Sequence, residues 1–195
     1  MIDLIFGTQN PNKVAEIQQL VPDTIRVRSL ADIGIFDDIP EEQNTLEGNA
    51  IQKSQYVFDR FKCNVFSDDT GLEVDVLNGE PGVFSARYAG PQKNSEDNMN
   101  KLLLSLKNET NRNARFRTVI AIFWNQKLHL FEGIVNGEIA KERRGSKGFG
   151  YDPIFIPNGY NQSFAEMPSV EKNKISHRGN AAKQLISFLK ENTLE

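Results

Sequence analysis

Two adjacent aspartates, Asp68 and Asp69, are the residues of this sequence that most directly indicate chemistry. They follow the apolar run 63–66, which is typical of a buried strand, and they precede Thr70 and Gly71, which predict a turn. Because successive side chains of a strand point to opposite faces, one aspartate can bind a metal ion while the other contacts a second partner. Oxygen ligands of this kind suit Mg²⁺, which also bridges to phosphates. A polar turn without chemistry is the alternative interpretation.

Glu41 and Glu42 add two carboxylates in the acidic segment 37–44. Carboxylates that are distant in sequence can converge at the ends of neighbouring strands, where a divalent cation would neutralise their repulsion. A carboxylate that the metal does not fully occupy can orient or deprotonate a water molecule. The carboxylates are therefore a candidate site for a metal and a general base, and a solvated acidic loop is the alternative.

The segment 8–13 joins a predicted strand, 2–6, to a helix that has Asn10 as its N-cap and Pro11 as its first residue. Backbone N–H groups at a helix N-terminus attract anions, and Lys13 adds a positive charge in the first turn. The glycine spacing and the Lys-Ser/Thr pair of a P-loop are missing. The segment is either a phosphate-binding loop of another kind or an ordinary capped helix start with a solvated lysine.

Two later segments, 143–153 and 171–179, combine glycine, aromatic and basic residues. Glycines let a ligand approach the backbone closely, Phe149 can stack on a planar base, and Asp152 can accept hydrogen bonds from ring N–H groups. Arg178 falls in the first turn of a predicted helix, where a cation opposes the helix dipole. Its planar donors fit a carbonyl or phosphate oxygen. For the segment 143–153, the alternative is a plain loop with aromatic anchors.

Strands and helices alternate in the first half of the chain, and an antiparallel pair follows. The apolar periodicity predicts strands at 2–6, 25–28, 63–66, 72–77, 115–124, 127–135 and 154–156. It predicts helices with Asn10, Asn44, Ser95 and Ser176 as their caps, and Phe61 is among the buried residues of the second helix. Asn125-Gln126 predicts a hairpin. We therefore expect an α/β protein with a mixed sheet and flanking helices.

The composition is that of a globular protein with one sizeable domain or two small lobes: 195 residues, 38% of them hydrophobic and 25% charged. The net charge of −3 disfavours a broad surface for nucleic acid or anionic membranes. The single cysteine, Cys63, cannot form an internal disulfide, which fits a reducing compartment. The sequence shows no signal-peptide pattern and no apolar run near the roughly 18 residues of a membrane span. We expect a cytoplasmic protein without a nucleic-acid or membrane partner.

Several motifs, taken in order, resemble those of the inosine triphosphate pyrophosphatase family. They are Thr8-x-Asn10-x-x-Lys13, Ser67-Asp68-Asp69-Thr70-Gly71, Gly82-Val83-Phe84-Ser85-Ala86-Arg87-Tyr88, Gly148-Phe149-Gly150-Tyr151-Asp152-Pro153 and Ser176-His177-Arg178. Each motif is weak alone, but their ordered occurrence over essentially the whole chain is highly specific. Gln9 departs from the glycine that is common in the first motif, and Thr70 replaces the serine of many bacterial relatives while keeping the hydroxyl.

The resemblance implies hydrolysis of ITP, dITP and XTP to the monophosphate and pyrophosphate, with Mg²⁺ as cofactor. It implies a homodimer, with Leu77–Gly90 as a candidate region for the dimer contact. It also implies that residues 1–195 form one domain, in which an elongated mixed sheet carries two lobes around a central nucleotide-binding cleft. The sequence leaves open the order of preference among the three nucleotides and the way in which GTP is rejected.

The same resemblance assigns the site residues. Asp69 is a metal ligand and the base, and Glu41, favoured over Glu42 and Glu47, is the other metal ligand. Thr70 lies beside the substrate, and Lys53 contacts a phosphate. The triphosphate is held by Thr8, Gln9, Asn10, Pro11, Asn12 and Lys13. The base pocket is lined by Phe149, Gly150, Tyr151, Asp152, Lys172, His177 and Arg178.

Two other functions compete with this interpretation. A non-catalytic nucleotide- or nucleic-acid-binding protein would explain the basic and aromatic segments, but it leaves the carboxylates without a purpose. A pyrophosphatase for another nucleotide, such as a modified pyrimidine, would use the same residues. His177 by itself is weak evidence, because a lone histidine is more often structural.

Overall fold

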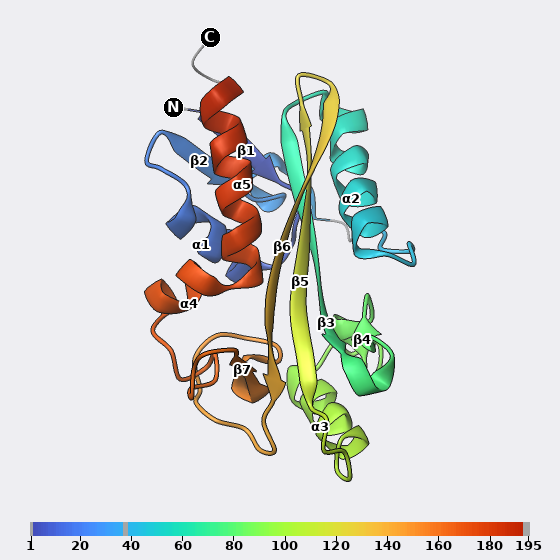
Figure 1. Cartoon of the computed structure of the whole chain (residues 1–195). Helices are drawn as coiled ribbons and strands as arrows, with labels where there is room; N and C mark the ends of the chain where they lie inside the picture. The colour runs from blue at the N-terminus through green and yellow to red at the C-terminus, as the bar shows by residue number, and fades with distance from the viewer. Residues whose placement is uncertain (1, 37–38, 193–195) are drawn as a thin grey trace. The chain divides into compact units, whose positions relative to one another are not determined.

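The computed structural model describes residues 2–36 and 39–192, and the chain divides into two compact units (Figure 1). The first unit comprises the residues up to Asp69, Thr118–Gly133 and the residues from Arg178 onward, and the second comprises Thr70–Arg117 and Ile134–His177. Three long strands contribute residues to both units: β3 (Val65–Val74), β5 (Asn113–Trp124) and β6 (Lys127–Ile139). Each unit is therefore built from segments that are distant in sequence.

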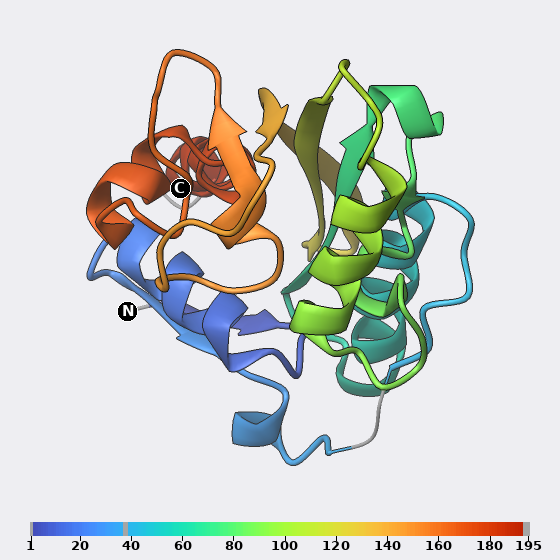
Figure 2. The ribbon, with the colours of Figure 1, turned by 90° about the horizontal axis from the view of Figure 1, so that it is seen from below.

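The first unit has a layer of strands with helices on both faces (Figures 1 and 2). In this layer β1 (Ile2–Phe6) pairs in parallel with β2 (Ile25–Arg28) and with β3. Helices α1 (Pro11–Leu20) and α5 (His177–Asn192) cover one face, and α2 (Leu46–Phe61) covers the other. Two cores result, one on each face of the strands.

The strands of the first unit alternate their side chains between these two cores. Phe66 and Ile122 pack in the core that includes α1 and α5, whereas their neighbours Val65 and Phe123 pack in the core that includes α2. This is the two-residue period of a β-strand. The position of a residue along β3 therefore determines which helices its side chain faces.

The second unit contains α3 (Ser95–Ser105), α4 (Ser169–Ile175), β4 (Pro81–Gly82) and β7 (Phe155–Pro157). Its core joins the ends of the long strands to α3 and to the segment after β7, through Leu72, Leu102, Phe116, Phe155 and Phe164 among others. The Arg112 guanidinium donates to the carbonyl oxygens of Leu106, Ile139 and Ala140 at 2.6–2.8 Å. This arginine ties the end of α3 to the end of β6.

The sheet is mixed, in the order β2-β1-β3-β5-β6-β7, with β4 paired to β3. The pairs of β1 are parallel, and the pairs β3–β4 and β6–β7 are antiparallel. Asn125 and Gln126 join β5 to β6 with φ values of 48° and 66°, as a two-residue hairpin turn requires. The predicted α/β fold with a mixed sheet and flanking helices is confirmed.

The segment that the sequence predicts as an acidic turn is instead the middle of β3. The strand continues without a break from Val65 to Val74, so parts of the predicted strands 63–66 and 72–77 belong to one strand. Residues Asp75–Leu77, predicted as the end of the second strand, form a 3₁₀ helix instead. Gly71 serves a close approach, because a Cβ there would lie 2.7 Å from the carbonyl oxygen of Gly82 on β4. Glycine was interpreted as a turn signal, but the tight pairing of two strands also requires it.

Smaller differences concern the helices. The cap of α2 is Thr45, whose hydroxyl accepts a hydrogen bond from the Gly48 N–H at 3.0 Å, and the cap of α3 is Asn94, so Asn44 and Ser95 are wrong by one residue. Neighbouring polar residues compete for the same cap position. Phe61 is 45% exposed, and the short helix α4 was not predicted. Asp37 and Asp38 of the acidic segment lie outside the described residues.

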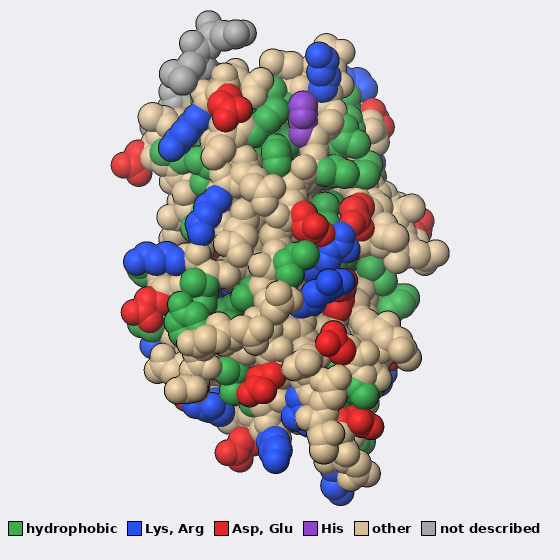
Figure 3. All heavy atoms as spheres, in the orientation of Figure 1, with side chains coloured by type: hydrophobic (Ala, Val, Ile, Leu, Met, Phe, Trp, Pro, Cys, Tyr) green, Lys and Arg blue, Asp and Glu red, His purple; other side chains and the backbone are tan. Residues whose placement is uncertain are grey.

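Acidic and basic side chains are interspersed on the face that Figure 3 shows. Among the helices in residues 2–36 and 39–192, none combines the length and the hydrophobicity that crossing a membrane requires.

Candidate active site

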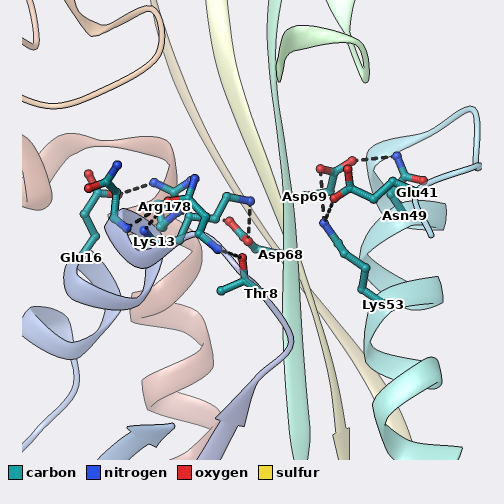
Figure 4. A network of polar contacts seen from close by, with 11 residues as sticks. Thr8, Lys13, Glu16, Glu41, Asn49, Lys53, Asp68, Asp69 and Arg178 are labelled. Carbon is teal, nitrogen blue, oxygen red and sulfur yellow. Dashed lines mark hydrogen bonds and ion pairs between the residues drawn. The ribbon is translucent and has the colours of Figure 1, made fainter. Parts of the chain in front are cut away.

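Strand β3 directs Asp68 and Asp69 to opposite faces of the first unit (Figure 4). Asp68 has the alternation of Phe66 and contacts residues of α1 and α5, whereas Asp69 has that of Val65 and contacts residues of α2. The prediction that the two side chains point to opposite faces of the strand is confirmed. Each aspartate is therefore the centre of its own polar cluster.

Asp68 is fully buried between two cations. Its Oδ1 accepts a hydrogen bond from Lys13 Nζ at 2.7 Å, and its Oδ2 accepts one from Arg178 Nε at 3.2 Å. Arg178 also donates to Glu16, one turn after Lys13 on α1. Burial acts to raise the pKa of Asp68, but the attraction of Lys13 and Arg178 outweighs it and holds the pKa well below the usual range. The carboxylates of Asp68 and Glu16 thus balance the charges of Lys13 and Arg178.

The segment 8–13 is a capped helix start, as predicted. Asn10 Oδ1 accepts hydrogen bonds from the N–H groups of Asn12 (2.9 Å) and Lys13 (3.4 Å), and Pro11 is the first helical residue. The Thr8 hydroxyl accepts from the Asn10 N–H at 3.2 Å. The Lys13 side chain is only 14% exposed, so the alternative of a solvated lysine is excluded. Burial lowers the pKa of Lys13, although Asp68 opposes it.

Gln9, which departs from the family motif, contacts the segment that follows β2. Its side-chain amide donates to the carbonyl oxygen of Ile35 at 3.2 Å. The contact links the loop before α1 to the segment that follows β2. Gln9 is therefore placed to fix the loop that leads into α1, the helix that carries Lys13.

Asp69 lies against α2, where it shares the Lys53 ammonium with Glu41. Asn49 Nδ2 donates to Asp69 Oδ2 at 3.0 Å, Lys53 Nζ is 3.6 Å from Asp69 Oδ1, and Lys53 also donates to Glu41 Oε1 at 2.5 Å. Burial raises the pKa of Asp69 despite the opposing charge of Lys53. Burial acts to lower the pKa of Lys53, but the attraction of Asp69 and Glu41 outweighs it and the pKa is raised. One ammonium therefore serves two carboxylates.

Helix α2 also holds the acidic loop that carries Glu41. Asn49 Oδ1 accepts from the Gln43 N–H at 2.9 Å, and Gln52 Oε1 accepts from the Glu42 N–H at 3.1 Å. Sequence reasoning missed Asn49, which is 1% exposed and contacts both the loop and Asp69. Its spacing of four residues from Lys53 on one helix face was the signal that could have identified it.

The carboxylates of Glu41 and Asp69 fit a divalent metal ion. Both already lie beside the same cationic group, the Lys53 ammonium. Within residues 2–36 and 39–192, no group of three or more His, Cys, Asp or Glu side chains is placed to hold a metal. Mg²⁺ is usually held by one or two carboxylates together with phosphates and water, so a pair of carboxylates is sufficient. Glu47, the third candidate, lies in the first turn of α2.

The second unit brings together the predicted residues around Asp152. Its Oδ2 accepts from Lys172 Nζ at 2.8 Å and from the Phe149 N–H at 2.8 Å, and both charged side chains are buried. The Lys172 ammonium lies 5.2 Å from the centre of the Phe149 ring. Gly148 has a φ of +73°, and a Cβ there would overlap the Asp152 carboxylate. The glycine is therefore needed for this loop to close on Asp152.

Tyr151 and His177 are buried in the second unit, whereas Arg178 belongs to the first. The Tyr151 hydroxyl donates to the Ser85 carbonyl oxygen at 2.9 Å, and His177 stacks on Phe116 with 4.5 Å between ring centres. Burial raises the pKa of Tyr151 well above its usual value. Gly150, with a φ of +65°, completes the turn between Phe149 and Tyr151.

Gly7 and Ser67 interlock where β1 meets β3, next to both aspartates. A Cβ at Gly7 would overlap the Ser67 hydroxyl, which is buried and has no hydrogen-bond partner among the described residues. We expect Gly7→Ala to lower the free energy of unfolding by about 1–3 kcal/mol through overpacking. Ser67→Ala should be nearly neutral or stabilising, because it removes an unsatisfied buried hydroxyl.

The double variant tests whether the two positions are coupled. Chemical denaturation of the wild type, both single variants and Gly7→Ala/Ser67→Ala should show that the second change restores most of the stability lost through the first. Additive effects would contradict the interlocking of the two residues.

Solved structures identify the class of fold to which this chain belongs. The structure of a HAM1 protein from Coxiella burnetii matches it with a TM-score of 0.90 and 38% identity, over 98% of this chain and all of that one. Proteins named dITP/XTP pyrophosphatase from Flavobacterium psychrophilum and Flavobacterium johnsoniae are 56% and 54% identical to it. These matches cover 97% and 95% of this chain and 100% and 97% of the two relatives.

The match to a protein-family model shows which family the chain belongs to. The Ham1 family model matches residues 4–188, and the chain therefore belongs to the Ham1 family. The resemblance recognised in the motifs is confirmed, because the relatives carry the name of a nucleoside triphosphate pyrophosphatase.

Proposed function

We propose that this chain hydrolyses nucleoside triphosphates with atypical purine bases, ITP, dITP and XTP, to the monophosphate and pyrophosphate. The relatives named dITP/XTP pyrophosphatase, more than half identical over nearly the whole chain, support this activity. The observation that carries the proposal is the pair of clusters around β3, in which Asp68 holds two cations and Asp69 shares Lys53 with Glu41.

In the proposed reaction, a water oxygen attacks the α-phosphorus and the bond from that phosphorus to the bridging oxygen breaks, so that pyrophosphate leaves. Asp69 accepts the proton of the water, a role that suits a carboxylate whose pKa is raised by burial. Lys13 and Lys53 neutralise the phosphates, and Thr70, the next residue of β3, contacts the substrate. A Mg²⁺ ion held by Asp69 and Glu41 would supply further charge neutralisation to the triphosphate.

The residues of the segment 8–13 are proposed to bind the triphosphate through the backbone N–H groups of the α1 N-terminus. The contacts of Arg178 with Asp68 and Glu16 favour a place for it with these phosphate-binding residues. The hydrogen bond to Asp68 holds the Lys13 ammonium in one position before the substrate binds. Such preorganised charges are most effective for a developing negative charge.

The group around Asp152 is proposed to recognise the base, together with Gly150, Tyr151 and His177. The Lys172 ammonium lies over the Phe149 ring, on which the purine is proposed to stack, and therefore belongs to the same group of residues. An ammonium donates hydrogen bonds only, so it suits a 6-oxo group and not the 6-amino group of adenine. A misplaced buried polar group costs on the order of 1–3 kcal/mol, so a few such contacts give strong selection.

We also propose that the protein works with Mg²⁺ as a cytoplasmic homodimer, each chain being a single catalytic domain, and that it acts on free nucleotides without a nucleic-acid or membrane partner. A binding protein for nucleic acid is the competing function. It would leave the carboxylates of Glu41 and Asp69 near a polyanion, and it would gain little from the mixed charges on the face shown in Figure 3.

The test is a product assay with Mg²⁺ and a panel of ITP, dITP, XTP, GTP, ATP and UTP. We expect monophosphate and pyrophosphate from the first three nucleotides and little product from GTP and ATP. Diphosphate and orthophosphate would place the attack at another phosphorus and overturn the mechanism. Turnover of UTP alone would favour a different base, and an absence of turnover together with Mg²⁺-independent binding of RNA or DNA would favour the binding protein.

A further inference from the structure

The Lys53 ammonium lies between the two carboxylates that are candidate metal ligands. Its Nζ is 2.5 Å from Glu41 Oε1 and 3.6 Å from Asp69 Oδ1, and its side chain is 6% exposed (Figure 4). The same lysine is a candidate ligand of the substrate phosphates. The same ammonium would therefore neutralise the carboxylates of Glu41 and Asp69 in one state and the substrate phosphates in another.

Charge balance explains why the lysine lies there. Two carboxylates that are close together and partly buried repel each other, and a cation between them removes that cost. In the described structure Lys53 supplies that cation, and Asn49 supplies a neutral donor to Asp69. A divalent ion that binds the same oxygens must therefore overcome both the repulsion of the ammonium and the loss of its ion pairs.

We propose that Lys53 competes with the divalent metal for Glu41 and Asp69, so that it keeps the metal affinity of the nucleotide-free protein low. This inference rests on the proposed function for the identity of the metal ligands. A triphosphate offers Lys53 other negative partners, and it releases the carboxylates. Metal binding and nucleotide binding are thereby coupled through the Lys53 side chain, which occupies both carboxylates in the nucleotide-free protein.

The consequence is that removing a cationic residue of the site strengthens metal binding. We expect Lys53→Met, which keeps the length of the side chain and removes its charge, to bind Mn²⁺ about tenfold or more tightly than the wild type in the absence of nucleotide. Lys53→Arg, which keeps the charge, should bind Mn²⁺ no more tightly than the wild type. The measurement is a titration of the full-length protein with Mn²⁺, followed by electron paramagnetic resonance of the free ion.

Two further variants show that the gain belongs to this site. Adding Glu41→Gln to Lys53→Met should return the affinity for Mn²⁺ to the wild-type level or below it, because one ligand is lost. Lys62→Met removes a lysine at the C-cap of the same helix, α2, whose side chain is 67% exposed, and it should leave Mn²⁺ binding unchanged.

Unchanged or weaker Mn²⁺ binding by folded Lys53→Met would overturn the proposal. If Lys53→Met does not fold, Lys53→Arg decides, since tighter Mn²⁺ binding by that variant contradicts competition by charge. The titration contains no nucleotide, so its result is independent of the product assay. A protein that releases the wrong products but shows the tighter binding would retain the competition and lose the proposed function.

Discussion

Asp69→Asn is expected to remove most of the turnover of XTP and dITP while the protein remains folded. An amide cannot take the proton of the attacking water and is a poorer metal ligand, so we expect kcat to fall by roughly 10²- to 10⁴-fold. The measurement is pyrophosphate release at saturating substrate, combined with urea denaturation of the same samples. The expected change in the free energy of unfolding is within about 1 kcal/mol.

The contacts of Asp69 explain why the fold should tolerate this change. Asn49 can still donate to the new amide oxygen, and Glu41 still holds Lys53. Burial raises the pKa of Asp69 above its value in the unfolded chain. The carboxyl therefore favours the fold most below the ordinary aspartate pKa and less as the pH rises through the raised value, and at neutral pH an amide avoids this cost.

Asp75→Asn provides a matched control. This exposed aspartate follows the end of β3, and its replacement should change neither kcat nor stability. Full activity of Asp69→Asn would sink the assigned base, and unfolding of that variant would mean that the loss of activity is not chemical.

Local properties of the sequence were sufficient to predict that the two aspartates point to opposite faces of their strand. The alternation of side chains on a strand is set by the backbone, so adjacent residues must face different layers even when the ends of the strand are misplaced. The cap of α1 was predicted for the same reason, because Asn10 and Pro11 act within one turn. The order of the motifs also identified the family.

Contacts between segments that are distant in the sequence could not be predicted from such local properties. Asp68 and Lys13 are 55 residues apart, and Arg178 and Glu16 are 162 residues apart. Nothing in the local pattern distinguishes Glu16 from the other polar residues of α1, and the role of Gly71 depends on the carbonyl oxygen of Gly82 on another strand. These features depend on which segments the fold brings together, so local patterns in the sequence could not predict them.

Asp68→Asn should have the opposite phenotype to Asp69→Asn, a large loss of stability. Lys13 and Arg178 are both buried, and the Asp68 carboxylate accepts a hydrogen bond from each. An amide has one acceptor oxygen, and its NH₂ group would face the second cation. Glu16 can still pair with Arg178, but the balance of two cations and two carboxylates is lost. Because a buried charge then lacks its partner, we expect a loss of about 3–5 kcal/mol in the free energy of unfolding.

Urea denaturation at neutral pH measures this loss directly, with Asp59→Asn as the control. Asp59 forms an ion pair with Lys62 at 3.3 Å, but its side chain is 57% exposed, so its replacement should cost no more than about 1 kcal/mol. The comparison of neighbouring residues is the sharper test, since Asp68→Asn and Asp69→Asn are the same chemical change at adjacent positions of one strand. If both variants lost similar stability, the assignment of Asp68 to charge balance and of Asp69 to chemistry would fail. A large loss for Asp68→Asn alone would mean that the strand separates the two tasks by directing one carboxylate to each of its faces.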